Sequence, residues 1–231
     1  MPIIHDEEFG KITIRRSARA SQVRLRVAPD GTLRASLPLY APSFLVKRLI
    51  KSSRQELRDM LAQAQPHTDY SDGMRIGKSH TLIVRNLNGG VTQVNRRGQQ
   101  IIVSLSPGNT LLDSDVVRKV RDGIITALRV EAKSYLPKRL SFLAVKSGFH
   151  YKKVRFSHAS GRWGSCTSEG TISLNIALMK LPFELIDYVI IHELAHTIHM
   201  NHSPEFLAQV SEGDPQYKLH RRSLKEEAPT I

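Results

Sequence analysis

His192-Glu193-Leu194-Ala195-His196 directly follows the apolar run Ile186-Asp187-Tyr188-Val189-Ile190-Ile191, and together they predict a buried helix. Residues four positions apart lie on one face of a helix, so the imidazoles of His192 and His196 can bind the same zinc ion. Glu193 projects beside such an ion, where its carboxylate can act as a general base. The stretch therefore predicts a zinc site held by a rigid helix.

A catalytic zinc site uses three protein ligands and keeps one position open. We expect His202 as the third ligand, six residues after His196 and beyond a helix end near Met200. His199 is the competing candidate, but it lies one turn further along and would strain to reach the ion. Cys166 is another possible ligand, although a lone cysteine is more often a small buried side chain. The spacing matches the metzincin pattern H-E-x-x-H-x-x-G-x-x-H, except that His199 replaces the turning glycine, so a true metzincin is not expected.

The composition is that of an ordinary soluble globular protein, with 231 residues, 40% hydrophobic and 24% charged. The single cysteine excludes an internal disulfide framework, as expected in a reducing compartment. The acidic N-terminus lacks the basic start and apolar run of a signal peptide. No stretch approaches the length of about 18 apolar residues that a membrane span needs. We expect a cytoplasmic protein with no membrane partner.

The net charge of +13 at pH 7 is unevenly distributed. Residues 1–109 hold 17 Lys and Arg against 8 Asp and Glu, a balance of +9, and residues 110–231 hold 17 against 13, a balance of +4. A basic surface attracts nucleic acid, nucleotides or acidic proteins, but it is also common on proteins without such partners. The charge therefore makes nucleic acid or a nucleotide a possible partner and does not identify one.

The hydrophobic periodicity predicts an α+β fold with two parts. A basic, β-rich N-terminal subdomain, residues 1–108, is expected to contain short strands, a turn at 29–31 and one helix after Ser43. A compact domain, residues 109–231, should follow, with a helix ending at Pro137, a small sheet, the His192–His196 helix and short C-terminal helices. Two of those short helices are expected after Ser203-Pro204 and Asp214-Pro215.

Several motifs together resemble the YgjP-like metallopeptidase family over most of the chain. They are Arg162-Trp163-Gly164-Ser165-Cys166, Ile172-Ser173-Leu174-Asn175, His192-Glu193-Leu194-Ala195-His196 and Met200-Asn201-His202-Ser203, with weaker similarity at 15–19 and 73–78. This family is related more distantly to SprT-like proteases, which act on proteins bound to DNA. The resemblance implies a zincin-like domain in which His192, His196 and His202 bind the metal and Glu193 is the catalytic glutamate.

The segment Arg162–Cys166 is expected to form a strand edge beside the active-site helix. Such an edge can bind an extended peptide by main-chain pairing, which makes Arg162, Trp163, Gly164 and Ser165 candidate substrate-binding residues. The structural alternative is that Trp163 fills the core and Gly164 allows close backbone approach. His158 and Tyr217 are possible transition-state donors, although a structural role is the more common one.

Three functions follow from these residues. The first is a zinc metallopeptidase, in which Glu193 assists the attack of zinc-bound water on a peptide bond. The second is hydrolysis of nucleoside triphosphates, because a member of the resembled family acts as a UTP pyrophosphatase; no phosphate loop supports it, since the glycines of Gly73–Lys78 are too closely spaced. The third is a nucleic-acid-binding module with structural zinc, which would need a fourth ligand such as His199 or Cys166.

Overall fold

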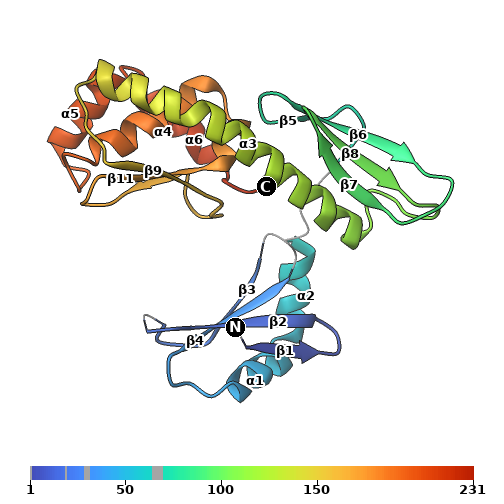
Figure 1. The fold of residues 1–231 in the computed structure, drawn as a ribbon. Coiled ribbons are helices and arrows are strands. Elements are labelled where there is room, and N and C mark those ends of the chain that lie inside the picture. The colour runs from blue at the N-terminus through green and yellow to red at the C-terminus, as the bar shows by residue number, and fades with distance from the viewer. Residues whose placement is uncertain (1, 19, 29–31, 64–69) are drawn as a thin grey trace. The chain divides into compact units, whose positions relative to one another are not determined.

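The computed structural model describes residues 2–18, 20–28, 32–63 and 70–231. The chain divides into two compact units, Met1–Asp69 and Tyr70–Ile231 (Figure 1). The turn that the sequence predicts at residues 29–31 lies outside the described residues. The two units have separate hydrophobic cores.

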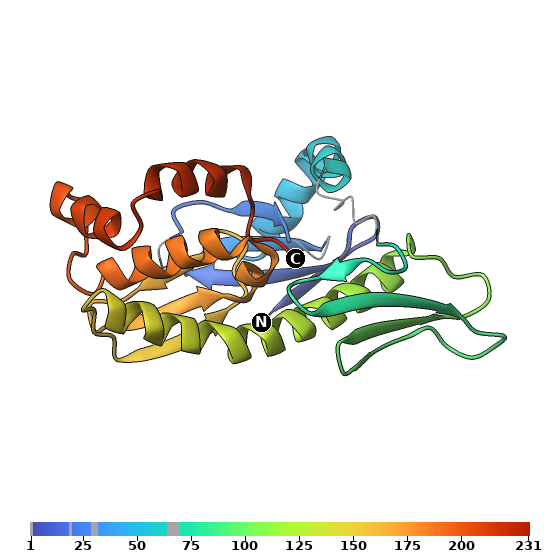
Figure 2. The same ribbon diagram turned by 90° about the horizontal axis from the view of Figure 1, so that it is seen from above.

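Unit 1 is a four-stranded sheet covered on one face by two helices (Figure 2). Its strand order is β1-β2-β4-β3, with β2 and β4 parallel and the other pairs antiparallel. The alternating apolar residues point to the helices, as the period-2 pattern predicts. The elements are β1 Ile3–Asp6, β2 Gly10–Ser17, β3 Arg24–Val27, β4 Leu33–Pro38, α1 Phe44–Ser52 and α2 Arg54–Gln63.

Unit 2 begins with a second four-stranded sheet, of order β5-β6-β8-β7, that packs against the long helix α3. The domain boundary expected after residue 108 therefore lies inside this unit. The reason is that buried residues of β6 and β8 share one core with α3, so these strands belong with the helices that follow them. The elements are β5 Arg75–Ile76, β6 His80–Asn86, β7 Gln93–Arg97, β8 Gln100–Leu105 and α3 Ser114–Lys146.

Helix α3 runs through Pro137, where the sequence predicts its end. Proline removes one backbone hydrogen bond from a helix interior. The buried stripe nevertheless runs from Leu136, just before the proline, to Leu140 and Leu143 beyond it, so tertiary packing holds the helix together. As a result, one 33-residue helix spans both sheets of unit 2 (Figures 1 and 2).

The rest of unit 2 forms a three-stranded sheet and the helices beside it. The sheet has the order β10-β11-β9, with β10 antiparallel and β9 parallel to β11. The expected α+β architecture is confirmed, but α4 ends at Ala195 rather than near Met200. The elements are β9 Lys153–Ser157, β10 Gly164–Cys166, β11 Thr171–Asn175, the 3-10 helix η1 Ile176–Lys180, α4 Phe183–Ala195, α5 Pro204–Gly213 and α6 Tyr217–Glu226.

Helix α5 begins as its sequence predicts, whereas α6 does not. Ser203 caps α5, with its side chain accepting a hydrogen bond from the backbone N–H of Phe206. Asp214 instead ends α5 and accepts from the N–H of Gln216, and α6 begins only at Tyr217. None of the helices built from described residues is long and apolar enough to cross a membrane.

Candidate metal centre

Helix α4 holds the first two histidines of the site on a buried support. Its apolar residues pack into the core of unit 2, and Asp187 accepts two hydrogen bonds from Arg139 of α3, at 2.7 and 2.5 Å. His192 lies in the last turn, and His196 caps the C-terminus with helical backbone angles. Their ring centroids are 4.9 Å apart. The i, i+4 spacing thus brings the two imidazoles together, as the sequence predicts.

The segment between α4 and α5 brings His202 to the same point. Its Nε2 atom is 3.3 Å from Nε2 of His192, and its ring centroid is 4.9 Å from that of His196. Among the described residues, one nitrogen from each of these three histidines lies within 4.8 Å of the others. His202 is exposed, so the group opens to solvent on one side. This spacing allows one ion to contact all three nitrogens.

Phe206 of α5 forms the floor of the cluster, a role that sequence reasoning missed. It is fully buried, and its ring centroid is 4.5 Å from that of His196, 5.0 Å from His192 and 4.9 Å from His202. The Ser203-Pro204 cap predicts the helix but not the direction of this side chain. Phe206 therefore fixes the positions of three rings that come from two separate segments.

His199 contributes its backbone to the cluster and not its ring. The Nδ1–H of His196 donates to the carbonyl oxygen of His199 at 2.9 Å. This bond fixes the tautomer of His196 and leaves its Nε2 lone pair for a metal ion. Neither His199 nor Cys166 belongs to the converging group among the described residues.

The electrostatics of the site keep two imidazoles neutral. Burial, reinforced by the neighbouring His196 and His202, lowers the pKa of His192 to about 4. Burial and His196 also lower the pKa of His202. Metal ions bind the neutral imidazole, so both groups are available as ligands near neutral pH. Three histidine nitrogens with one open side suit zinc.

Glu193 lies on the buried side of α4, with only 5% of its surface exposed. Burial raises the pKa of its carboxyl to about 8, and the charge of Arg162 opposes that rise. Its Oε2 atom has no hydrogen-bond partner among the described residues. A buried acceptor without a partner is rare, and it is explained here if a water molecule or substrate group binds beside the three histidines.

Strand β10 lies at the edge of its sheet, next to α4. A Cβ atom built on Gly164 would lie 2.5 Å from Oε1 of Glu193, so only glycine leaves room for this carboxylate. Trp163 pairs with Asn175, and Ser165 pairs with Ser173. Because antiparallel bonding alternates, the backbone N–H and C=O groups of Gly164 and Cys166 point to the open edge.

Asn175 orders the loop before β10, and sequence reasoning did not identify this role. Its fully buried side chain donates to the carbonyl oxygens of Ala159 and Arg162, at 2.6 and 2.9 Å, and accepts from the N–H of Ala177 at 3.0 Å. In the sequence, Asn175 stands out only as the last residue of the motif Ile172-Ser173-Leu174-Asn175. Its three bonds fix the backbone that presents Arg162 to Glu193.

The other candidate residues take more peripheral positions. The charged groups that act on His158 are all on α3, so this histidine lies beside that helix. Tyr217 lies near Tyr188, whose ring centroid is 6.0 Å from that of His192. Trp163 packs, partly buried, against the core. Burial and then Glu193 raise the pKa of the Cys166 thiol, which is therefore not an activated nucleophile.

Three histidines around an open position, with a buried glutamate beside the first of them, are an arrangement of the kind that metal-dependent hydrolases use. The chain belongs to the YgjP-like family: the model described as "YgjP-like, metallopeptidase domain" matches residues 21–227. No curated protein matches the chain. One solved structure is similar, the metallopeptidase zymogen abylysin of Pyrococcus abyssi, with 26% identity over 39% of this chain and 92% of that chain. Its TM-score of 0.36 is too low to inform on this fold.

Proposed function

We propose that the protein is a zinc-dependent peptidase in which His192, His196 and His202 hold the metal and Glu193 is the general base. The proposal rests on the convergence of the three histidine nitrogens within 4.8 Å of one another, beside the helix that carries His192 and Glu193. Zinc bound there would polarise a carbonyl group and make water nucleophilic near neutral pH. The protein's own groups would transfer the proton and bind the substrate.

Glu193 would accept a proton from the attacking water and pass it to the leaving amine. Its surroundings suit this exchange, because burial raises the carboxyl pKa to about 8. The positive charge of a bound metal ion would favour the carboxylate form and bring that pKa down, which leaves Glu193 ionised for the first transfer. Gly164 supports the step by leaving space for the carboxylate.

The open edge of β10 offers a place for an extended peptide. The outward backbone groups of Gly164 and Cys166 can pair with a substrate main chain, as in β-strand addition. Gly164 also lies in space directly against the carboxylate of Glu193. A peptide on this edge would therefore run past the proposed base.

Hydrolysis of nucleoside triphosphates is the second candidate, and two arginines favour it. The positive charge of Arg162 lowers the pKa of Glu193, and that of Arg221 lowers the pKa of His192 and His202, so both guanidinium groups lie near the site. Guanidinium groups bind phosphate well. The Gly73–Lys78 segment gives no support, because the N–H groups of Lys78 and Ser79 donate to the carboxylate of Glu131, at 2.7 and 2.8 Å. A phosphate would need those same donors.

The two functions are separated by assaying zinc-loaded protein with a quenched fluorescent peptide library and, in parallel, with UTP. The peptidase proposal predicts cleavage of library peptides that stops when a chelator removes zinc. Pyrophosphate release from UTP with all peptides intact would contradict it and favour the second function. In that event Arg221→Gln should raise the KM for UTP.

A further inference from the structure

The sheet of unit 1 has two faces of different chemistry. One face packs under α1 and α2 and is apolar; its fully or nearly buried residues are Ile4, Ile12, Ile14, Leu33, Ala35 and Leu37. Side chains alternate along a strand, so the residues between these point to the opposite face. Within unit 1 no described helix covers that opposite face.

The strand register places basic residues side by side on the uncovered face. Arg15 of β2 and Arg24 of β3 both pair with Ser36, which lies between them on β4. In the next row, Arg34 of β4 lies beside Arg26 of β3. We call this the basic face; its cationic residues are Lys11, Arg15, Arg24, Arg26 and Arg34, all of them exposed.

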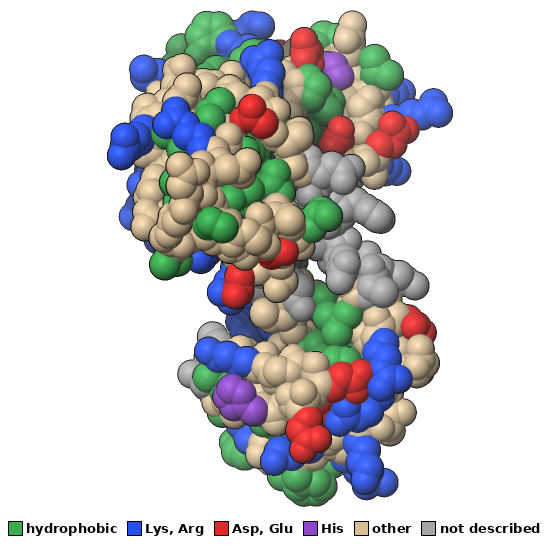
Figure 3. Space-filling model, turned by 90° about the vertical axis from the view of Figure 1, so that its right-hand side faces the viewer, with side chains coloured by type: hydrophobic (Ala, Val, Ile, Leu, Met, Phe, Trp, Pro, Cys, Tyr) green, Lys and Arg blue, Asp and Glu red, His purple; other side chains and the backbone are tan. Residues whose placement is uncertain are grey.

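The acidic side chains that the structure describes in unit 1 lie elsewhere. Asp6 and Glu8 form ion pairs with Arg54 of α2, at 3.1 and 2.5 Å, and Glu8 also pairs with Arg58. None of the strand residues on the basic face is acidic. On the view drawn in Figure 3, by contrast, acidic and basic side chains lie among one another. The basic face therefore concentrates positive charge more than composition alone requires.

Four of the five cations of the basic face form no ion pair with the acidic residues that the structure describes. These four are Lys11, Arg15, Arg24 and Arg26. Exposed like charges held this close repel one another and destabilise the fold slightly. Such an arrangement is explained if an anionic partner binds across the face.

We propose that the basic face binds the phosphate backbone of nucleic acid without sequence preference. Neighbouring strands are about 4.8 Å apart and alternate residues about 7 Å apart, so the face presents cations at the short, regular intervals at which phosphates follow one another. Four of the five cations are arginines, which bind phosphate through two parallel hydrogen bonds. The hydroxyl groups of Thr13 and Ser36 lie in the same rows and can donate to phosphate oxygens.

The side chains of this face favour nucleic acid over other anionic partners. No Phe, Tyr or Trp stands among its strand residues, so base stacking contributes little and phosphate contacts dominate. A membrane-binding face would add large apolar side chains for insertion, and among the described strand residues of this face only Ile3, at the edge of the sheet, is of this kind. This inference does not depend on the proposed peptidase activity, because its test measures binding.

The test uses the full-length protein and fluorescein-labelled 30-nucleotide single-stranded DNA, single-stranded RNA and duplex DNA, with fluorescence anisotropy at several salt concentrations. The triple variant Arg15→Gln, Arg24→Gln, Arg26→Gln removes three charges from the basic face. Its matched control, Lys47→Gln, Arg48→Gln, Lys51→Gln, removes three exposed charges from α1, on the helix-covered side. Thermal unfolding of both variants shows whether the fold is kept.

We expect the basic-face variant to bind at least about tenfold more weakly and to lower the slope of log K against log salt by about 2 for single strands, while the α1 variant changes little. Comparison of the three probes shows which form of nucleic acid supplies the phosphates. Equal losses in both variants would overturn the proposal, because net charge alone would then explain binding. No binding of the unmodified protein to any probe, or binding only to phosphatidylserine vesicles, would also overturn it.

Discussion

Gly164 of the edge strand β10 lies directly against the carboxylate of Glu193 on α4. A Cβ atom at position 164 would lie 2.5 Å from Oε1 and 2.8 Å from the carboxyl carbon of Glu193. The backbone angles of Gly164 lie outside the left-handed region, so the glycine is required for space and not for conformation. The strand proposed to bind substrate and the proposed base are therefore positioned against each other.

Replacing this glycine should displace the base. We expect Gly164→Ala to lower kcat for peptide cleavage by about 10–100-fold while zinc still binds, because a misplacement of about 1 Å is costly in catalysis. The matched control is Gly161→Ala, where an added Cβ meets nothing within 4 Å. Unchanged kcat in Gly164→Ala, measured at equal zinc content, would show that the close contact has no role in the reaction.

The raised pKa of Glu193 should appear in the stability of metal-free protein. The folded carboxyl has a pKa of about 8 and the unfolded one an ordinary value of 4.5, so the folded state holds an extra proton between those pH values. Below about pH 6.5 the lowered pKa of His192 acts in the opposite direction. As the pH rises from 6.5 to 8, the free energy of unfolding of the wild type should therefore fall by about 2 kcal/mol through Glu193. Glu193→Gln has no carboxyl at this position and should not show this loss. Urea unfolding of both proteins at pH 6.5 and 8 measures this difference. An equal fall in the free energy of unfolding of wild type and Glu193→Gln would contradict the prediction.

The identity of the third ligand can be tested by replacing each of two histidines, three residues apart, with alanine in separate variants. We expect His202→Ala to weaken zinc binding by more than about a hundredfold, because outer-shell groups alone contribute about 10–100-fold. His199→Ala should keep zinc, since His199 acts through its backbone carbonyl. Zinc titration against a competing chelator gives both affinities. The reverse order of losses would make His199 the ligand and exclude His202.

Asn175 should stabilise the loop that leads into β10. We expect Asn175→Ala to cost about 2–4 kcal/mol in the free energy of unfolding, because it removes three hydrogen bonds of a fully buried side chain, each worth about 1 kcal/mol. Asn86→Ala, at an exposed strand end, should stay within about 0.5 kcal/mol of the wild type. Urea unfolding compares the two variants. Equal stability of both would show that the loop is held by other contacts.

Much of unit 1 and of the metal centre could be predicted from local patterns. The strands at residues 10–17, 24–27 and 33–38 follow from strict alternation of apolar and polar residues. The pairing of His192 and His196 follows from the helical repeat. The approach of His202 also agrees with its spacing, because the chain leaves α4 and returns to the same point before α5.

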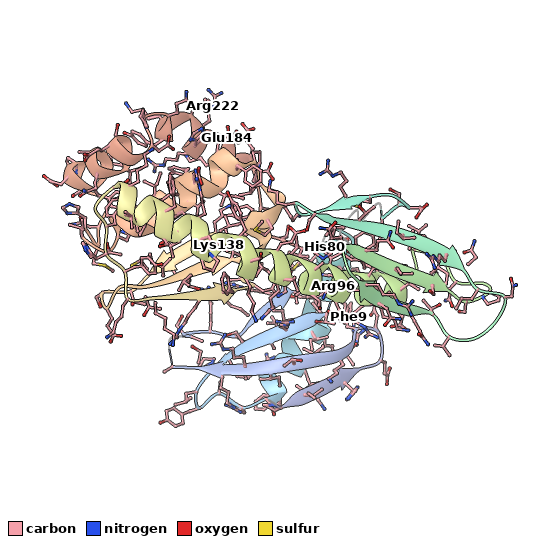
Figure 4. All side chains as sticks on the ribbon, turned by 45° about the horizontal axis from the view of Figure 1, so that its top comes forward. Phe9, His80, Arg96, Lys138, Glu184 and Arg222 are labelled. Carbon is pink, nitrogen blue, oxygen red and sulfur yellow. The ribbon has the colours of Figure 1, made fainter. Side chains whose placement is uncertain are left out.

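Other features depend on packing between distant segments, which local patterns do not encode. Pro137 indicates a helix end by itself, but the buried leucines on both sides of it bind α3 to the core. Nδ1 of the buried His80 lies 2.7 Å from the carboxylate of Glu131, and this contact joins β6 to α3 (Figure 4 labels His80). Strand β6 therefore belongs to the same unit as α3, and the boundary between the units lies near residue 69. The role of Phe206 likewise depends on its contact with the rings of three histidines from other segments, which its own local sequence does not indicate.

The central claim, that Glu193 acts as the base beside zinc held by three histidines, is tested most directly by comparing wild type and Glu193→Gln at matched zinc content. Each sample is brought to one zinc ion per chain, and the cleavage rate of a peptide selected from the library is measured. We predict that the variant binds zinc like the wild type and cleaves about 10²–10⁴-fold more slowly. Equal cleavage rates at equal zinc content would contradict the account.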